Sequence, residues 1–105
     1  MNTSRKITTL SKPTGNDPIP LGTFWYFRAR NQMHLYSLVI DEFVKSALTQ
    51  ADLARRLGKT PDRVCKMLAT PGNWESNTAS DYLFAISGAE INYSLSYPAL
   101  EKADE

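Results

Sequence analysis

The chain is 105 residues long, 42% hydrophobic and 22% charged, with one cysteine and a formal net charge of +1. This length suits a single domain, and the composition excludes a collagen, a coiled-coil rod and a wholly disordered chain. One cysteine cannot form an intramolecular disulfide, no secretory leader follows Met1, and no apolar run approaches the ~20 residues that a membrane helix requires. We therefore expect a cytoplasmic protein that does not cross a membrane.

Charge is distributed unevenly along the chain. Residues 1–44 hold five basic and three acidic groups, residues 45–66 hold six basic and two acidic, and residues 67–105 hold one basic and six acidic. A cationic block beside an acidic C-terminal third can give the molecule one positive face, which attracts a phosphate backbone although the total charge is near zero. An ordinary solvated helix surface would have the same composition.

The first part of the chain separates into an arm and a long helix. Three prolines and two glycines in residues 1–22 oppose a regular helix, so we predict a flexible N-terminal arm there. From Thr23 the helix breakers stop and apolar residues recur at steps of three and four, which predicts an amphipathic helix of about 25 residues. The apolar positions of this helix are Met33, Tyr36, Val39, Ile40, Phe43, Val44 and Ala47.

Two short helices follow, and local chemistry defines their ends. Thr49 and Asp52 form a capping box, which predicts a helix over 50–57, and Gly58 can take the left-handed conformation that stops it. Thr60 is a good N-cap and Pro61 fits the first helical position, so a third helix is predicted from 61 to about 69.

The last third of the chain predicts a helix and then a strand. Helical spacing of apolar residues before Gly88 indicates a fourth helix, and after it the period changes to two, which indicates one strand over Ile91–Tyr97 that ends at Pro98. The strand could pair with Lys6–Leu10 of the same chain or with a second copy. Trp74 is expected in the core, with contact to DNA as the alternative for Trp74 and Asn73.

The helical pair resembles a known family. In the stretch TQADLARRLGKTPDRVCKML, the glutamine, alanine, glycine and valine at Gln50, Ala54, Gly58 and Val64 match the pattern of the phage-repressor-like (Cro/repressor-type, XRE) helix-turn-helix family. The resemblance covers residues 48–88 well. This stretch is also similar to small autoregulators and to antitoxin-like members of the family. It implies an all-α, four-helix DNA-binding domain over residues 23–105, with the flexible arm before it and the strand at its C-terminal end.

A helical wheel of the third helix separates a buried side from an outward side. Val64, Met67 and Leu68 point inward, which leaves Asp62 and Lys66 opposite them, Arg63 on one flank and Cys65 on the other. The resemblance implies that the outward side meets the major groove. There, lysine and arginine can donate to guanine and aspartate can accept from cytosine. At the second position of its helix, Asp62 is also explained as a complement to the helix dipole.

Phosphate contacts are expected around the N-termini of these two helices, where backbone N–H groups attract anions. The candidate residues are Thr49, Gln50, Lys59 and Thr60. The family often reads adenine with a glutamine near the start of the third helix, but this chain has Pro61 there, so adenine readout from that position is not expected. Arg55 and Arg56 lie on the outer side of the second helix, and either could be a solvated charge.

An enzyme is not expected. The single histidine, His34, and the single cysteine, Cys65, are far apart in the sequence, and there is no glycine-rich loop or pair of carboxylates at a catalytic spacing. The same inventory predicts no metal site and no cofactor. A lone thiol beside the outward side could sense oxidants, but a simple packed or half-exposed thiol is the alternative.

These features predict a sequence-specific DNA-binding regulator that acts as a homodimer on a palindromic operator, because one module makes few base contacts. The residues expected at the dimer contact are the aromatic start of the first helix and the unpaired strand: Phe24, Trp25, Phe27, Ile91, Tyr93 and Leu95. The alternative is an antitoxin that neutralises a toxic enzyme through its N-terminal helix or its acidic tail.

Overall fold

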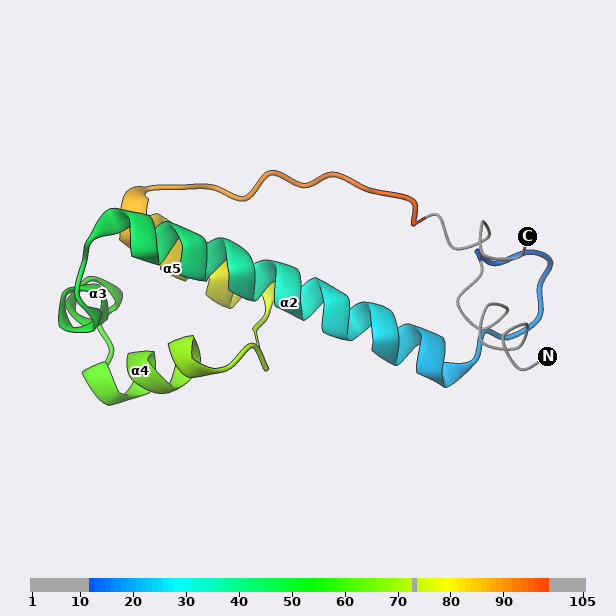
Figure 1. The fold of residues 1–105 in the computed structure, drawn as a ribbon, viewed down its shortest axis with the longest axis horizontal. Helices are drawn as coiled ribbons and strands as arrows, with labels where there is room; N and C mark the ends of the chain where they lie inside the picture. The colour runs from blue at the N-terminus through cyan, green and yellow to red at the C-terminus, as the bar shows by residue number, and fades with distance from the viewer. Residues whose placement is uncertain (1–11, 73, 99–105) are drawn as a thin grey trace. The chain divides into compact units, whose positions relative to one another are not determined.

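A computed structural model of the chain describes residues 12–72 and 74–98. These residues form four helices (Figure 1): α2 (Leu21–Ser46), α3 (Gln50–Leu57), α4 (Pro61–Ala69) and α5 (Ser76–Ser87). They divide into two units, one of residues 30–92 and one of residues 12–29 with 93–98. The predicted all-α fold class is confirmed, and α3 and α4 have the predicted bounds.

The long helix begins slightly earlier than the sequence indicated. α2 includes Leu21 and Gly22, and the backbone N–H of Thr23 donates to the carbonyl of Pro20 at 3.0 Å. Proline and glycine are tolerated here because the first turn of a helix has no intrahelical acceptors for its N–H groups. Residues 12–20 contain a turn and no helix, and residues 1–11 of the predicted arm lie outside the described residues.

The apolar side of α2 is narrower than predicted. Val39 is fully buried and Tyr36, Ile40 and Phe43 pack against the core, but Met33 and Val44 are exposed. Ala47 lies beyond the end of the helix with a φ of 62°, a left-handed conformation that is uncommon for a residue with a Cβ. The helix therefore ends at Ser46, whose hydroxyl accepts the N–H of Leu48 at 3.1 Å.

The predicted C-terminal strand is wrong for the single chain. Residues 89–98 are neither helix nor strand, and none of the described residues is in a strand. The alternation of apolar and polar residues after Gly88 favours an extended backbone, but a strand exists only when a second segment accepts and donates its hydrogen bonds. The candidate partner within the chain, Lys6–Leu10, lies outside the described residues.

The junction between α3 and α4 has the geometry that the local sequence predicted. The hydroxyl of Thr49 accepts the N–H of Asp52 at 3.0 Å, and the carboxylate of Asp52 accepts the N–H of Thr49 at 3.3 Å. Gly58 is left-handed with a φ of 69°, and the hydroxyl of Thr60 accepts the N–H of Arg63 at 3.2 Å. Two capped helices and a short turn thus fix the angle between α3 and α4.

The core of residues 30–92 collects side chains from all four helices and from the loop after α4. Its buried members are Val39, Leu53, Ala54, Val64, Leu68, Trp74, Ala79, Tyr82, Leu83 and Ile86. Trp74 belongs to this core, as predicted: the indole N–H donates to the carbonyls of Met67 and Thr70 at 3.1 Å, and the ring packs edge-on against Tyr82. Trp74 therefore closes the C-terminal end of α4.

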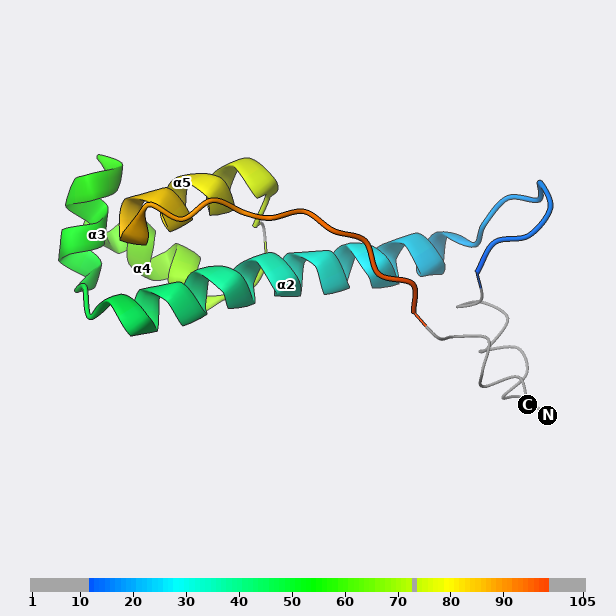
Figure 2. The ribbon, with the colours of Figure 1, turned by 90° about the horizontal axis from the view of Figure 1, so that it is seen from above.

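Polar contacts join the helix ends across this core. α5 lies alongside the C-terminal half of α2 (Figure 2), and the hydroxyl of Ser87 donates to the carboxylate of Glu42 at 2.7 Å. The guanidinium of Arg56 donates to the carbonyls of Ala85 and Ile86 at 2.9 and 3.1 Å. Because the last carbonyls of a helix have no intrahelical donor, Arg56 caps α5 from α3.

Acid is expected to weaken the start of α3. The backbone N–H of Thr49, and then its hydroxyl, hold the pKa of Asp52 below its ordinary value of 3.8. A lowered folded-state pKa adds stability above the unfolded value, and this stability is lost as the pH falls through the folded pKa. Thermal unfolding followed by circular dichroism should therefore show a smaller fall in Tm between about pH 5 and about pH 2.5 for Asp52→Asn than for the wild type.

The matched control is Asp81→Asn, because Asp81 is exposed on α5 and caps no helix. This variant should show the wild-type fall in Tm. Equal falls in all three proteins would contradict a contribution of the Asp52 cap to acid unfolding.

Candidate nucleic-acid interface

The two sides of α4 differ as the helical wheel predicted. Val64 and Leu68 are buried and Met67 is half-buried, so this side faces the core. The remaining side chains are exposed and form the outer side of α4: Asp62, Arg63, Cys65, Lys66 and Ala69. The outer side is therefore available to another molecule, and the structure brings the three predicted base-reading residues together on it.

Asp62 and Lys66 are joined in a way that the sequence analysis did not consider. The Lys66 ammonium lies 3.3 Å from the Asp62 carboxylate, one helical turn away, and both side chains are nearly 80% exposed. An exposed ion pair of this kind contributes little to stability because water screens it. Either member can therefore leave the pair when a phosphate or a base offers a better partner.

Arg63 lies at the third position of α4, where its backbone N–H is capped by Thr60. Its charge reaches the hydroxyl of Tyr82 on α5: burial raises the pKa of Tyr82, and Arg63 offsets part of this increase. The Tyr82 hydroxyl is buried and has no hydrogen-bond partner among the described residues. Arg63 is therefore exposed on α4 and its charge also acts on a buried group of α5.

The cationic block of residues 45–66 is largely compensated. Lys45 pairs with Glu42 at 3.3 Å, Arg55 pairs with Asp52, and Arg56 is held by the carbonyls at the end of α5. Of the six basic residues in the block, only Lys59 and Arg63 make no ion pair or hydrogen bond through their side chains with the described part of the chain. The charge available to a polyanion is thus smaller than the count in the sequence suggested.

The predicted phosphate-contacting residues are all exposed. Thr49 and Gln50 lie at the N-terminus of α3, and Lys59 and Thr60 lie in the turn before α4. The hydroxyl of Thr60 already accepts a backbone N–H group, so its proton is left to donate to an anion, whereas the hydroxyl of Thr49 also interacts with the carboxylate of Asp52. Of these four residues, only Lys59 brings a positive charge.

The residues predicted at a dimer contact differ in exposure. Phe24, Trp25, Tyr93 and Leu95 are exposed, the last two to 77% and 83%. Phe27 is only half-exposed and lies edge-on to Tyr26, with ring centroids 5.1 Å apart. Ile91 packs against the core of residues 30–92. The structure therefore leaves four of the six side chains accessible to a partner.

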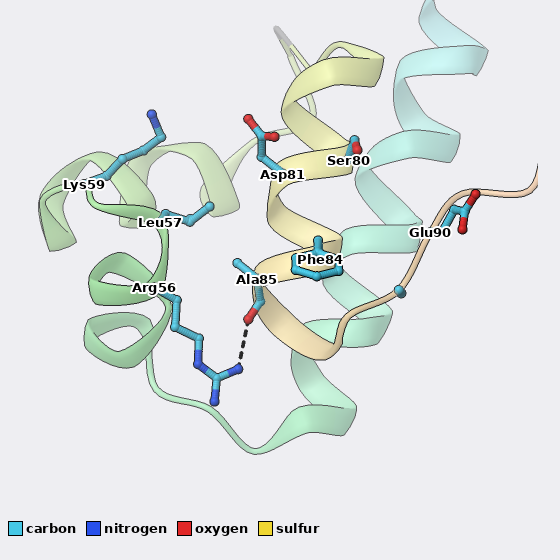
Figure 3. Close-up of a pocket in the computed structure, with 9 residues that line it drawn as sticks. Arg56, Leu57, Lys59, Ser80, Asp81, Phe84, Ala85 and Glu90 are labelled. Carbon is cyan, nitrogen blue, oxygen red and sulfur yellow. Dashed lines mark hydrogen bonds between the residues drawn. The ribbon is translucent and has the colours of Figure 1, made fainter.

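One surface feature was missed by the sequence analysis. An open groove of about 910 Å³ lies between the end of α3 and α5, and we call it the α5 groove. Figure 3 shows Leu57 and Lys59 on one side of it, with Asp81, Phe84 and Ala85 on α5. Phe84 is 70% exposed. The sequence signal that could have indicated this groove is Phe84, a large aromatic residue outside the buried side of a short helix.

Among the described residues, no group of three or more histidine, cysteine, aspartate or glutamate side chains could hold a metal ion. None of the described helices combines the length and hydrophobicity needed to cross a bilayer. Comparisons with protein-family models, curated proteins and solved structures find no match for this chain.

Proposed function

We propose that the protein is a sequence-specific DNA-binding transcriptional regulator, in which α3 and α4 act as a helix-turn-helix. The observation that supports this most is the outer side of α4. It presents donors and an acceptor from Arg63, Lys66 and Asp62 on a short helix that is rigidly capped and backed by the core. Such a helix is preorganised to enter a groove without refolding.

The dimensions and chemistry of α4 fit the major groove. An α-helix with its side chains is about 10–12 Å in diameter, and the major groove is about 12 Å wide. On contact, the Asp62–Lys66 pair opens, Lys66 and Arg63 donate to O6 and N7 of guanine, and Asp62 accepts from N4 of cytosine. Lys59 and the N-terminus of α3, with Thr49 and Gln50, bind phosphates and set the docking angle.

We further propose that the regulator acts as a homodimer on a palindromic operator, in the cytoplasm, and represses its own operon. Three outward side chains on α4 provide few base contacts, and a second copy one DNA turn away doubles them. The exposed apolar side chains of Phe24, Trp25, Tyr93 and Leu95 support association.

A second candidate function is that of an antitoxin, which neutralises a toxic enzyme by binding it. The exposed Phe24 and Trp25 at the start of α2 favour this alternative, because a contiguous aromatic surface indicates a protein partner. The acidic residues after Pro98, which could serve the same purpose, lie outside the described residues.

The test is the salt dependence of binding. The full-length protein is used to select a duplex from a random library, and the Kd for that duplex is measured at several salt concentrations. We expect log affinity to fall steeply with log salt, because each neutralised phosphate releases counterions. Lys59→Ala should reduce the slope by about one, whereas the control Lys45→Ala should leave it unchanged because Lys45 is paired on α2. Failure to select any duplex, or a slope near zero, would overturn the proposal.

A further inference from the structure

The lining of the α5 groove is part apolar and part charged. Its apolar members are Leu57, Phe84, Ala85 and Ala89, and its charged members are Arg56, Lys59, Asp81 and Glu90. Figure 3 shows Arg56 and Lys59 facing α5, which carries Asp81 and Phe84. Arg56 is already engaged by α5. An occupant of this groove must therefore be apolar on the side that meets Phe84, and it gains nothing from a net charge.

The chain itself contains a segment with these properties. Residues 91–98 have no charged side chain, and Tyr93, Leu95 and Tyr97 are 77–85% exposed. They occupy alternate positions, so an extended backbone places them on one side. Together with the two preceding odd positions, they give the apolar series Ala89, Ile91, Tyr93, Leu95 and Tyr97, and its midpoint is Tyr93.

This symmetry matters for two copies of the chain. If two extended segments run antiparallel about a two-fold axis at Tyr93, Leu95 of one copy lies opposite Ile91 of the other, and Tyr97 lies opposite Ala89. Directly opposite residues in an antiparallel pair point to the same face. Because Ala89 lines the α5 groove, this register brings Tyr97 of one copy to the groove of the other.

We propose that the α5 groove is the docking site for residues 93–97 of a second copy, with the two segments pairing antiparallel about Tyr93. The inference rests on the homodimer of the proposed function and names its contact. It also gives the unpaired N–H and C=O groups of residues 91–97 their missing partners. The strand that the single chain lacks is then a property of the dimer.

The size of this contact is sufficient for a stable association. Each copy contributes three large exposed side chains from the segment and Phe84 from the groove. At ~150–250 Å² for each aromatic side chain, the two symmetric contacts bury on the order of 1,000–1,500 Å². Specific interfaces bury roughly 1,200–2,000 Å² in total.

The register is tested by cysteine cross-linking of the full-length chain. Cys65 is exposed, so Cys65→Ser is the background. Under mild oxidation, we expect Tyr93→Cys to form a disulfide-linked dimer on its own, because each Tyr93 faces its symmetry mate. Asn92→Cys and Ser94→Cys should cross-link only when the two variants are mixed. Self-linking of Asn92→Cys or of Ser94→Cys, with none for Tyr93→Cys, would overturn this register.

The groove is tested by light scattering without DNA at micromolar concentration. We expect the wild type at about twice the monomer mass of 11.8 kDa, and Phe84→Glu and Leu95→Glu to raise the dimer Kd at least tenfold. The control Val44→Glu changes an equally exposed apolar residue on α2 and should leave the Kd unchanged. Circular dichroism checks that each variant retains its helices.

The outcomes separate the two proposals. A wild-type monomer would overturn both the groove contact and the homodimer. A wild-type dimer that tolerates Phe84→Glu would overturn the groove contact alone, even if Tyr93→Cys cross-links. Dissociation by Trp25→Ala, with Leu95→Glu still dimeric, would likewise overturn it and assign the interface to α2. DNA binding is judged separately by the salt slope.

Discussion

Lys66→Ala and Arg63→Ala are each expected to reduce the preference for a selected duplex over random DNA by tenfold or more. The two side chains are exposed on the outer side of α4, where the proposed function has them donate to guanine. A bidentate base contact provides roughly 1–3 kcal/mol of discrimination. The measurement is fluorescence anisotropy at one fixed salt concentration, with the selected duplex and single-base variants of it.

Gln50→Ala provides the comparison, because a phosphate contact at the N-terminus of α3 has no sequence information. This variant should weaken binding to all duplexes alike. Asp62→Asn removes the carboxylate that pairs with Lys66, so it should strengthen binding to random DNA and lower discrimination. If Lys66→Ala and Arg63→Ala weaken the affinity for every duplex equally, both residues contact phosphates and not bases.

Trp74→Ala is expected to destabilise the unit of residues 30–92 by about 3–5 kcal/mol. Trp74 is 1% exposed, packs against Tyr82, and donates to two carbonyls at the end of α4. The substitution leaves a large cavity and removes the donor that satisfies those carbonyls. Urea unfolding followed by circular dichroism measures the free energy of unfolding.

The matched control is Trp25→Ala, which removes the same side chain from an exposed position on α2 and should change the free energy of unfolding by less than about 0.5 kcal/mol. Trp74→Phe keeps most of the ring volume but loses the N–H donor. It should lower the free energy of unfolding by an amount between those of Trp74→Ala and Trp25→Ala. Similar effects for Trp74→Ala and Trp25→Ala would contradict the position of Trp74 in the core.

The helix boundaries were predictable because their determinants are local. The cap formed by Thr49 and Asp52, the left-handed Gly58 and the pair of Thr60 and Pro61 act within four residues, and they place α3 and α4 correctly. The inward side of α4 followed in the same way from the spacing of Val64, Met67 and Leu68. Local signals were therefore sufficient to predict that Asp62, Arg63 and Lys66 are exposed on the same helix.

The features that the sequence did not reveal depend on contacts between distant residues. Arg56 caps α5 29 and 30 positions away, and the hydroxyl of Tyr36 donates to the carbonyl of Leu68 32 positions away. No local pattern distinguishes such a residue from a solvated one. The prediction of a strand at Ile91–Tyr97 was wrong for a related reason. Alternation of apolar and polar residues predicts an extended backbone, but it does not predict a second segment that pairs with it.

The side chains that hold α4 in place are not the ones exposed on its outer side, and this separation affects how the sequence of such a protein can evolve. The contacts that keep this helix in place come from its inward side, from the Thr60 cap and from Trp74 and Tyr36 at its C-terminal end. The residues at the outer positions 62, 65, 66 and 69 are exposed and do not belong to the core. Substitutions there leave the free energy of unfolding nearly unchanged, so a lineage can explore new recognition preferences by single steps without passing through unstable intermediates.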